Sequence, residues 1–380
     1  MLDVPAMVLN ASERVNLLGL ERAALESLVF ELGSKPFRAR QLMHWLYKRG
    51  EGRISEMTDL AKDFRKLLEE RTEVRTPEIV SAHVSADGTR KWLLKADAAQ
   101  AFEMVFIPED DRGTLCISSQ VGCALDCSFC STGQEGFNRN LSTAEIVGQV
   151  WLAKRELGEG PQTGLAGERI VTNVVLMGMG EPLANFRAVV PALRIFLDDF
   201  GFDLSRRRVT LSTSGLAPQI LKLAQEVNCA LAVSLHAPED ALRNELVPIN
   251  KKHPIAELLD ACWHYIDEQN GRSVTFEYVM LAGVNDSVSQ ARALAALLKG
   301  HPAKVNLIPF NPFPGTHYRR SAPEVIERFR DELVGRGVLA TIRRTRGDDI
   351  DAACGQLAGR VIDRTTARLG NKHMNVAVLS

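Results

Sequence analysis

The sequence predicts an α/β fold, a partial TIM-like (β/α)6 barrel that follows a helical N-terminal region. Short apolar, β-branched runs alternate with helical patterns over most of the 380 residues, which indicates a parallel sheet with helices outside it. Only six such strand–helix units occur, fewer than the eight of a closed barrel. We therefore expect one side of the barrel to stay open, as a large substrate requires.

The elements follow one another in a simple order. The hydrophobic pattern is helical from residue 14 to about 75, and strand-like from about 79 to 107 around an Asp87-Gly88 turn. The six barrel strands are expected at 115–119, 170–178, 208–213, 229–236, 273–281 and 304–310. The helices are expected at 142–157, 184–199, 216–226, 254–269, 286–299 and 322–336, the first beginning with a capping box of Ser142 and Glu145. A last strand at 338–344 and a polar tail from Gly347 to Ser380 complete the chain.

These patterns divide the chain into four parts. We expect a helical N-terminal unit at 1–78, a connecting β segment at 79–108, the barrel at 109–346 and a C-terminal segment at 347–380.

The composition is that of an ordinary globular protein. Hydrophobic residues make up 45% and charged residues 24% of the chain, so disorder is not expected. No apolar run approaches the roughly 20 residues that a membrane span needs, and the first residues lack the basic start and apolar core of a signal peptide. We therefore expect a cytoplasmic, monomeric protein without membrane contact.

A basic, aromatic segment lies near the N-terminus, although the net charge of −1 does not by itself indicate a nucleic-acid partner. No acidic residue occurs between Lys35 and Arg49, where Phe37, Trp45 and Tyr47 alternate with basic residues. The basic residues are Lys35, Arg38, Arg40, Lys48 and Arg49. Such a segment forms either a surface that binds phosphates and stacks on bases or an amphipathic helix with core aromatics and solvated cations.

The cysteines point to metal chemistry. There are seven, and four of them fall within the fifteen positions from 116 to 130, which does not suit a disulfide framework. Cys123, Cys127 and Cys130 have the spacing C-x3-C-x2-C after a predicted strand. Three thiolates can bind three irons of a [4Fe-4S] cluster and leave the fourth iron open. S-adenosylmethionine (SAM) can bind there and be cleaved to a 5′-deoxyadenosyl radical. The alternative is a zinc site with Cys116 or a distant residue as the fourth ligand.

Small and polar motifs occur where four of the strands should end, the edge at which α/β barrels build their active sites. They lie at 177–183, 212–215, 234–237 and 309–315. Gly178 and Gly180 allow close approach of a ligand, and Glu181 can accept a hydrogen bond from an ammonium group. Taken alone, His236 could be structural or functional.

Two further positions suggest chemistry outside the cysteine triad. Glu103 lies on a strand whose two faces are both apolar, so its pKa should be raised unless the strand is a sheet edge and the side chain reaches solvent. Cys354 lies in a polar loop before a glycine, which suggests a functional residue. By spacing alone Cys116 could be a buried small side chain, and Cys229 and Cys262 fit that interpretation within apolar patterns.

CALDCSFC, preceded by CISSQVG and followed by GFNRN, resembles the RlmN/Cfr family of radical SAM RNA adenine methyltransferases. Nearly the whole chain shares the resemblance, through KPFRARQ, IPEDDR, MGMGEP, TLSTSG, SLHAP, VPINKK, NPFPG and RTRGDDIDAACGQLAG. The last block favours the RlmN branch over Cfr. The family implies a partial (β/α)6 radical SAM barrel with an N-terminal accessory domain for RNA. It also implies methylation at C2 of adenosine 2503 in 23S rRNA and of adenosine 37 in certain tRNAs.

The resemblance also implies roles for individual residues. Cys354 would accept a methyl group from a first SAM, and a second SAM, cleaved at the cluster with a flavodoxin- or ferredoxin-type reductant, would supply the radical that activates it. The carbon radical would add to C2, which is not nucleophilic. Cys116 would then resolve the adduct by attacking Cys354 and leave a disulfide, and Glu103 matches the proton acceptor. The positions that match SAM contacts are Gly180, Glu181, Ser212, Ser234, Leu235, His236 and Asn311.

Two alternatives stay open at this point. A Cfr-type enzyme would methylate C8 by the same mechanism, and spacing alone does not separate the two positions. A zinc-stabilised RNA-binding protein without catalysis is the alternative from a different class.

Overall fold

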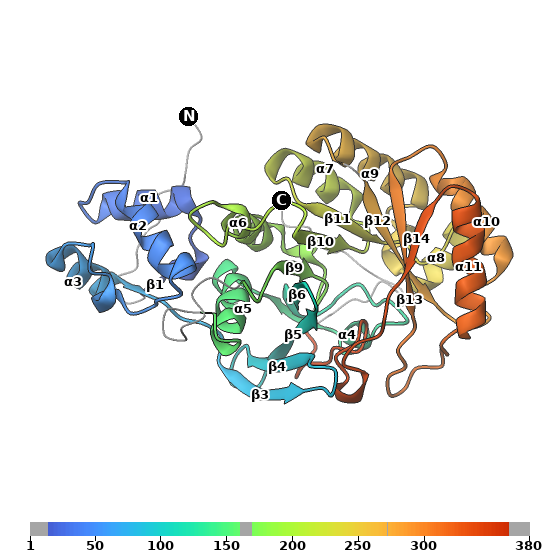
Figure 1. Cartoon of the computed structure of the whole chain (residues 1–380), viewed down its shortest axis with the longest axis horizontal. Coiled ribbons are helices and arrows are strands. Elements are labelled where there is room, and N and C mark those ends of the chain that lie inside the picture. The colour runs from blue at the N-terminus through green and yellow to red at the C-terminus, as the bar shows by residue number, and fades with distance from the viewer. Residues whose placement is uncertain (1–13, 160–168, 272, 365–380) are drawn as a thin grey trace.

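The computed structural model describes residues 14–159, 169–271 and 273–364, and its centre is a ten-stranded sheet (Figure 1). The strand order is β14-β13-β12-β11-β10-β9-β6-β5-β4-β3. Seven neighbouring strands are parallel: β6 (Arg112–Cys116), β9 (Asn173–Leu176), β10 (Val209–Thr213), β11 (Ala230–Ser234), β12 (Val274–Met280), β13 (Ala303–Pro309) and β14 (Leu339–Ile342). Within the described residues the sheet has two free edges, so the prediction of an open, partial barrel is confirmed.

The six predicted barrel helices are all present. They are α5 (Thr143–Glu156), α6 (Phe186–Leu197), α7 (Ala217–Glu226), α9 (Ile255–Gln269), α10 (Val288–Leu298) and α11 (Pro323–Gly335). The first begins at the predicted capping box, in which the Ser142 side chain accepts from the Glu145 N–H and the Glu145 carboxylate accepts from the Ser142 N–H. Each helix follows a strand, so that the helices cover the outside of the sheet (Figure 1).

The first barrel strand ends earlier than the apolar pattern predicts. The pattern places it at 115–119, whereas β6 ends at Cys116. The Ser118 N–H donates to Oε1 of Gln149 at 2.8 Å, and Nε2 of Gln149 donates to the Ser118 carbonyl at 2.9 Å. A side-chain amide of α5 thus replaces a neighbouring strand, and no hydrophobic pattern shows such a substitution.

The predicted β segment extends the sheet with three antiparallel strands, β3 (Ile79–Val84), β4 (Arg90–Lys95) and β5 (Ala101–Glu109). The turn between the first two lies at the predicted dipeptide, where Gly88 has φ +84° and Asp87 accepts the Thr89 N–H at 2.9 Å. Because β5 pairs with β4 on one side and β6 on the other, Glu103 is on an interior strand, and the sheet-edge interpretation of this residue is wrong.

The N-terminal region is helical, as predicted, with α1 (Arg22–Glu31), α2 (Arg38–Met43) and α3 (Lys62–Arg71) and the shorter turns η1 (Leu17–Gly19), η2 (His44–Lys48) and η3 (Ile54–Glu56). A two-residue parallel pair joins β1 (Val15–Asn16) to β2 (Thr72–Glu73). These helices lie beside α5 and α6 (Figure 1). The Trp151 indole N–H donates to the Leu46 carbonyl at 2.8 Å, and the Tyr47 ring lies 4.9 Å from the Phe202 ring.

The basic, aromatic segment serves mainly the core. Trp45 and Tyr47 are buried and cannot stack on a base, so the amphipathic-helix interpretation is correct for both. Phe37 is exposed. Some cations are engaged within the chain, since Arg49 stacks on the Trp45 ring at 4.0 Å and Lys48 pairs with Asp203 at 3.0 Å.

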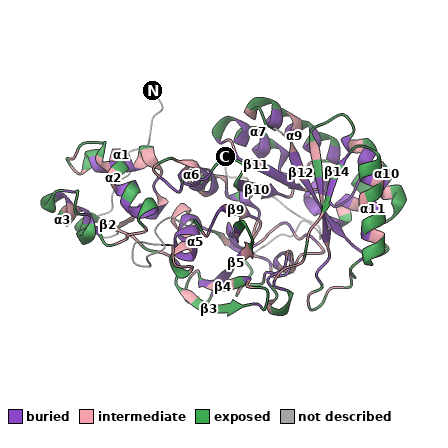
Figure 2. Ribbon diagram, viewed as in Figure 1, coloured by how far each residue is buried: buried purple, intermediate pink, exposed green. Residues whose placement is uncertain are grey.

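Burial is concentrated in the sheet and in the inner faces of the helices (Figure 2). Among the described residues, no helix is both long and apolar enough to cross a membrane. The predicted domain boundaries stay predictions, and residues 1–13 of the first part and 365–380 of the last lie outside the described residues.

Candidate active site

The three cysteines of the predicted cluster motif lie on one loop that a β ribbon closes. The ribbon pairs β7 (Gln120–Gly122) with β8 (Phe137–Asn140), and the loop between them contains the short helix α4 (Ser131–Gln134). At its base the Cys123 N–H donates to the Gly136 carbonyl at 2.7 Å. Gly122 has φ +79°, and a Cβ there would lie 2.0 Å from that carbonyl oxygen, so only glycine fits. Hydrophobic periodicity did not predict this ribbon.

The cluster-loop thiols fit a polynuclear iron centre. Burial raises the pKa of Cys123 to about 12 and raises the pKa values of Cys127 and Cys130, and the negative charges of Cys123 and Cys130 raise the pKa of Cys127 further. Such thiols ionise when a metal supplies the compensating charge. Within the described residues, no three His, Cys, Asp or Glu side chains converge on a single ion, so the zinc alternative gains no support. A cube distributes its thiolates over three irons and needs no such convergence.

The loop after β9 is tied to the cluster ribbon and to the loop after β10. Glu181 is buried and begins the turn η4 (Pro182–Asn185); its N–H donates to Oε1 of Gln120 at 2.9 Å. Its carboxylate accepts the Ser214 N–H at 2.7 Å and the Leu183 N–H at 3.0 Å. Gly180 has φ +98°, and a Cβ there would lie 2.5 Å from the Gln120 side chain. The turn therefore places Glu181 at the end of the sheet beside the ribbon that closes the cysteine loop.

His236 is a neutral side chain in the core of the site. Burial lowers the pKa of His236 to about 3, and its ring meets that of Phe129 edge to face at 4.5 Å. Nδ1 accepts the Val279 N–H at 3.0 Å, so the proton of the neutral ring is on Nε2. The residue has φ +59°. Its Nε2–H is therefore a fixed donor.

Arg243, which the sequence patterns did not single out, joins two of the predicted loops. It lies on α8 (Asp240–Leu246), a helix missed by the prediction together with the turn η5 (Pro248–Lys251). The guanidinium is fully buried. It donates to the carbonyls of Leu235 at 3.1 Å, Ser234 at 2.9 Å and Ser214 at 2.7 Å, and to Oδ1 of Asn250 at 2.6 Å. Ser212, at the end of β10, lies beside β11 through its pairing with Ala232.

The segment that carries Cys354 docks on the cluster loop. The Ser131 N–H donates to the Gly355 carbonyl at 2.8 Å, and the Thr132 hydroxyl donates to the Leu357 carbonyl at 2.7 Å. The predicted polar tail is therefore packed structure up to residue 364 and includes the turn η6 (Asp348–Ile350). Cys354 raises the pKa of Cys130, which places the two thiols within electrostatic reach.

Asn311 fixes the same segment from the opposite side. Its Nδ2 donates to the Cys354 carbonyl at 3.3 Å, while Oδ1 accepts from Arg320 at 2.6 Å and from the Thr345 hydroxyl at 3.3 Å. Asn311 follows β13, whose end lies at the same edge as the other loops. The structure thus joins the predicted loop at 309–315 to the predicted methyl-accepting cysteine.

Glu103 lies beneath this segment as a buried carboxylate. Burial raises the pKa of Glu103, and the Lys91 ammonium, 3.2 Å from Oε1, opposes that increase. Oε2 accepts the Ala358 N–H at 3.0 Å. Glu135, at the end of α4, accepts the next amide, that of Gly359, at 2.9 Å, and burial raises its pKa to about 7. The predicted desolvation of Glu103 is confirmed.

Cys116 and Cys354 interact electrostatically although they are far apart in the chain. Burial raises the pKa of Cys116 to about 12, and a negative charge on Cys354 raises it further. Burial also raises the pKa of Cys354, while the neighbouring Arg343 guanidinium lowers it. All seven cysteines are free thiols in this structure. Cys229 and Cys262 are buried, as expected of core residues.

Cys354 lines a cavity of about 890 Å³ inside the partial barrel. The wall includes seven Lys or Arg side chains and only two carboxylates, those of Glu109 and Glu277. Glu277 is buried and accepts from Nδ2 of Asn306 at 3.1 Å. The cavity therefore joins the thiol to a strongly basic opening.

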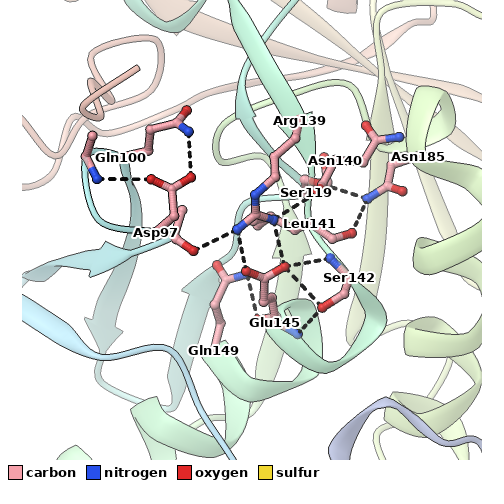
Figure 3. A network of polar contacts seen from close by, with 12 residues as sticks. Asp97, Gln100, Ser119, Arg139, Asn140, Leu141, Ser142, Glu145, Gln149 and Asn185 are labelled. Atoms are coloured by element: carbon pink, nitrogen blue, oxygen red, sulfur yellow. Dashed lines mark hydrogen bonds and ion pairs between the residues drawn. The ribbon is translucent and has the colours of Figure 1, made fainter. Parts of the chain in front are cut away.

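A polar network behind the ribbon holds its strands in place (Figure 3). Arg139 makes a bidentate pair with Glu145, at 2.9 and 2.8 Å, and also donates to the Ala96 carbonyl. Asn185 Nδ2 donates to the carbonyls of Ser119 and Leu141 at 2.8 and 2.7 Å. The ribbon is thereby joined to α5 and to the Glu181 turn.

Comparison with known proteins gives two matching family models and one extensive structural match. Residues 15–74 match the ribosomal RNA large subunit methyltransferase N-terminal domain, and residues 117–294 match the radical SAM superfamily. The crystal structure of a radical SAM methyltransferase from Sphaerobacter thermophilus is 45% identical, with a TM-score of 0.82, over 90% of this chain and 99% of that one. The chain belongs to the RlmN family of radical SAM methyltransferases.

Two further solved structures are much less similar. A domain of pyruvate-formate lyase-activating enzyme from Bacteroides vulgatus is 18% identical, with a TM-score of 0.35, over 45% of this chain and 99% of that one. SuiB from Streptococcus suis, bound to the precursor peptide SuiA, is 14% identical, with a TM-score of 0.43, over 61% of this chain and 49% of that one. Similarities this weak have no bearing on the activity of the RlmN-family chain.

Membership of the RlmN family makes this protein a radical SAM rRNA methyltransferase and implies a [4Fe-4S] cluster, SAM and an rRNA substrate. The alternative of a non-catalytic zinc protein is therefore wrong.

Proposed function

We propose that this enzyme methylates C2 of adenosine 2503 in 23S rRNA, and C2 of adenosine 37 in tRNA, through a methyl group carried on Cys354. The observation that carries the proposal is the docking of the Cys354 segment on both the cluster loop and Glu103. Through Ser131 and Ala358 this segment brings the methyl acceptor, the cluster motif and a buried carboxylate into one site.

Cys123, Cys127 and Cys130 would hold the cluster, which with SAM supplies a radical able to remove hydrogen from a methyl group. The predicted SAM contacts Gly180, Glu181, Ser212, Ser234, Leu235, His236 and Asn311 surround the same edge of the barrel. Glu181 offers a carboxylate for an ammonium group and His236 a fixed Nε2–H donor. Two SAM molecules per turnover follow, because one donates the methyl group and the other the radical.

The two remaining thiols have separate tasks. The Cys354 thiolate would attack the methyl group of SAM, displace S-adenosylhomocysteine and carry the methyl group. After radical addition the adduct would lose one electron to the oxidised cluster and the C2 proton to Glu103. Cys116 would then attack the Cys354 sulfur, and the S–C bond would break with its electron pair on the methylene carbon, which takes up a proton to become the methyl group of the released base. That step oxidises the two thiols to a disulfide, which a thiol reductant must reduce before the next turnover. A low-potential flavodoxin or ferredoxin would supply electrons to the cluster.

The charge of the cavity supports an RNA substrate for this site. Arg206, Arg207, Lys304 and Arg344 line the cavity, and within the described residues their side chains make no hydrogen bond or ion pair. Such cations can contact phosphates while the target base enters toward Cys354.

Nucleoside analysis tests the proposal. RNA treated with the anaerobically prepared enzyme should contain 2-methyladenosine at the two positions, identified by chromatography and mass spectrometry. Detection of 8-methyladenosine without 2-methyladenosine would instead make the enzyme Cfr-type.

Variants of the two thiols test their separate tasks. Cys354→Ala should abolish methylation before any protein–RNA adduct forms, whereas Cys116→Ala should accumulate a covalent adduct that denaturing gels detect. Full activity of either variant would refute the task assigned to that cysteine.

A further inference from the structure

The two oxygens of the Glu103 carboxylate have different partners. Oε1 lies 3.2 Å from Nζ of Lys91, and Oε2 accepts the Ala358 N–H at 3.0 Å. The Lys91 and Glu103 side chains are 13% and 7% exposed, so solvent hardly reaches the pair. The carboxylate is therefore held between one cation and the backbone of the Cys354 segment.

The sheet dictates the position of Lys91. In the antiparallel pair of β4 and β5, Leu93 lies opposite Glu103, so Lys91 lies two residues further along the same face as its diagonal neighbour. Nζ also donates to the Asp351 carbonyl at 3.2 Å. This second bond fixes the ammonium between the strand and the loop before Cys354.

Two groups stabilise the charge of Glu103, because the Lys91 ammonium and the Ala358 N–H both lower its pKa. Burial raises its pKa, and the negative charge of Asp351 raises it further. Glu135 is a second carboxyl group near it, because Glu103 raises the pKa of Glu135. The Lys91 ammonium is the largest of the effects that lower the pKa of Glu103. A carboxyl group can accept a proton only when it is ionised, so the ammonium helps to keep Glu103 ready to act.

We propose that Lys91 is a positioning residue for methyl transfer, which keeps the Glu103 carboxylate ionised and directed toward the Cys354 segment. This inference rests on the proposed function, in which Glu103 accepts the proton that leaves C2 of the adenine. In that step the C2–H bond breaks, its electron pair stays with the adenine, and the carboxylate becomes a neutral acid. Lys91 keeps its charge and exchanges neither a proton nor an electron.

The test compares Lys91→Met, Lys91→Arg and Lys95→Met. Lys95 is the matched control, because it lies on the same strand and pairs with Glu78 at 2.8 Å, but the pair is exposed. A neighbouring cation lowers the pKa of a carboxyl group by about 1–3 pH units, so Lys91→Met should move the acid limb of the single-turnover rate profile to higher pH by about that much and lower the rate on its acid side. Raising the pH should recover the rate, because the acid limb of the profile moves to higher pH.

The adduct provides a second readout that a merely structural role would not change. In Lys91→Met, Cys354 should be methylated as in the wild type, but the covalent protein–RNA species should accumulate because loss of the C2 proton is slow. Lys91→Arg should restore both the pH profile and the adduct level, and Lys95→Met should match the wild type. If Lys91→Met is too unstable to purify, Lys91→Gln, which removes the charge but keeps a polar side chain, takes its place in both measurements.

Glu103→Gln separates failure of the inference from failure of the proposed function. If Glu103→Gln accumulates adduct while Lys91→Met shows a wild-type pH profile and no extra adduct, the role of Lys91 is refuted and the proposed function stands. If Glu103→Gln methylates RNA as fast as the wild type, the proton-acceptor role fails and the inference fails with it.

Discussion

Replacement of Arg243 by methionine should destabilise the fold, because its guanidinium makes four buried hydrogen bonds. Each hydrogen bond to a charged group stabilises by about 1.5–3 kcal/mol, so the four together contribute at least about 6 kcal/mol. Burial lowers the pKa of Arg243 to about 10, a penalty on the charged form of about 3 kcal/mol. The difference predicts that Arg243→Met lowers the free energy of unfolding by about 3 kcal/mol.

Urea denaturation of the anaerobically purified variants measures this difference. Arg243→Lys keeps the charge but cannot reach four acceptors from one nitrogen, so it should recover less than half of the loss. Arg292→Met removes an arginine that is 58% exposed and pairs with Glu332, and it should leave the denaturation midpoint almost unchanged. If Arg243→Met and Arg292→Met have the same denaturation midpoint, the view that the buried guanidinium holds the loops together is refuted.

Two further predictions concern the cluster loop. Gly122→Ala should lower the denaturation midpoint far more than Gly283→Ala. Both positions have positive φ, but only a Cβ at position 122 would meet a carbonyl oxygen, that of Gly136. Equal effects of the two substitutions would contradict this prediction. Glu135 has a folded pKa of about 7, raised by burial, so the folded chain binds more protons than the unfolded chain between about pH 4.5 and 7. Its contribution to stability is therefore lost as the pH rises through this window, and Glu135→Gln should flatten that part of a pH–stability profile; an unchanged slope would contradict the assignment.

The sequence predicted the elements well because hydrophobic periodicity is a local signal. The capping box of Ser142 and the turn at Gly88 depend on residues a few positions apart, and both are where the pattern places them. The end of β6 was missed because Gln149, more than thirty positions later, replaces the strand pairing of Ser118. A hydrophobic pattern cannot predict a hydrogen bond between a strand end and a side chain so distant in the sequence.

Site residues could be predicted only where they belong to a sequence motif or to a block that resembles a known family. The spacing of Cys123, Cys127 and Cys130 is such a motif. Arg243 and Lys91 have none, because Arg243 bonds mainly to backbone carbonyls and Lys91 to a residue on another strand. A lone arginine on a helix and a lone lysine on a strand resemble ordinary solvated residues in the sequence, and only the fold brings them to their acceptors.

In the proposed function, the electrostatics around Cys354 and Cys116 favour the order in which the two thiols react. Arg343 lowers the pKa values of both Cys354 and Cys116, and a thiolate at Cys354 raises the pKa of Cys116. The two thiols therefore compete for one positive charge and are not readily ionised together. In the proposed function Cys354 ionises first and becomes a neutral thioether when it is methylated. Loss of the negative charge on Cys354 removes one of the effects that raise the pKa of Cys116, so the thiol that attacks last becomes easier to ionise once the first has been methylated.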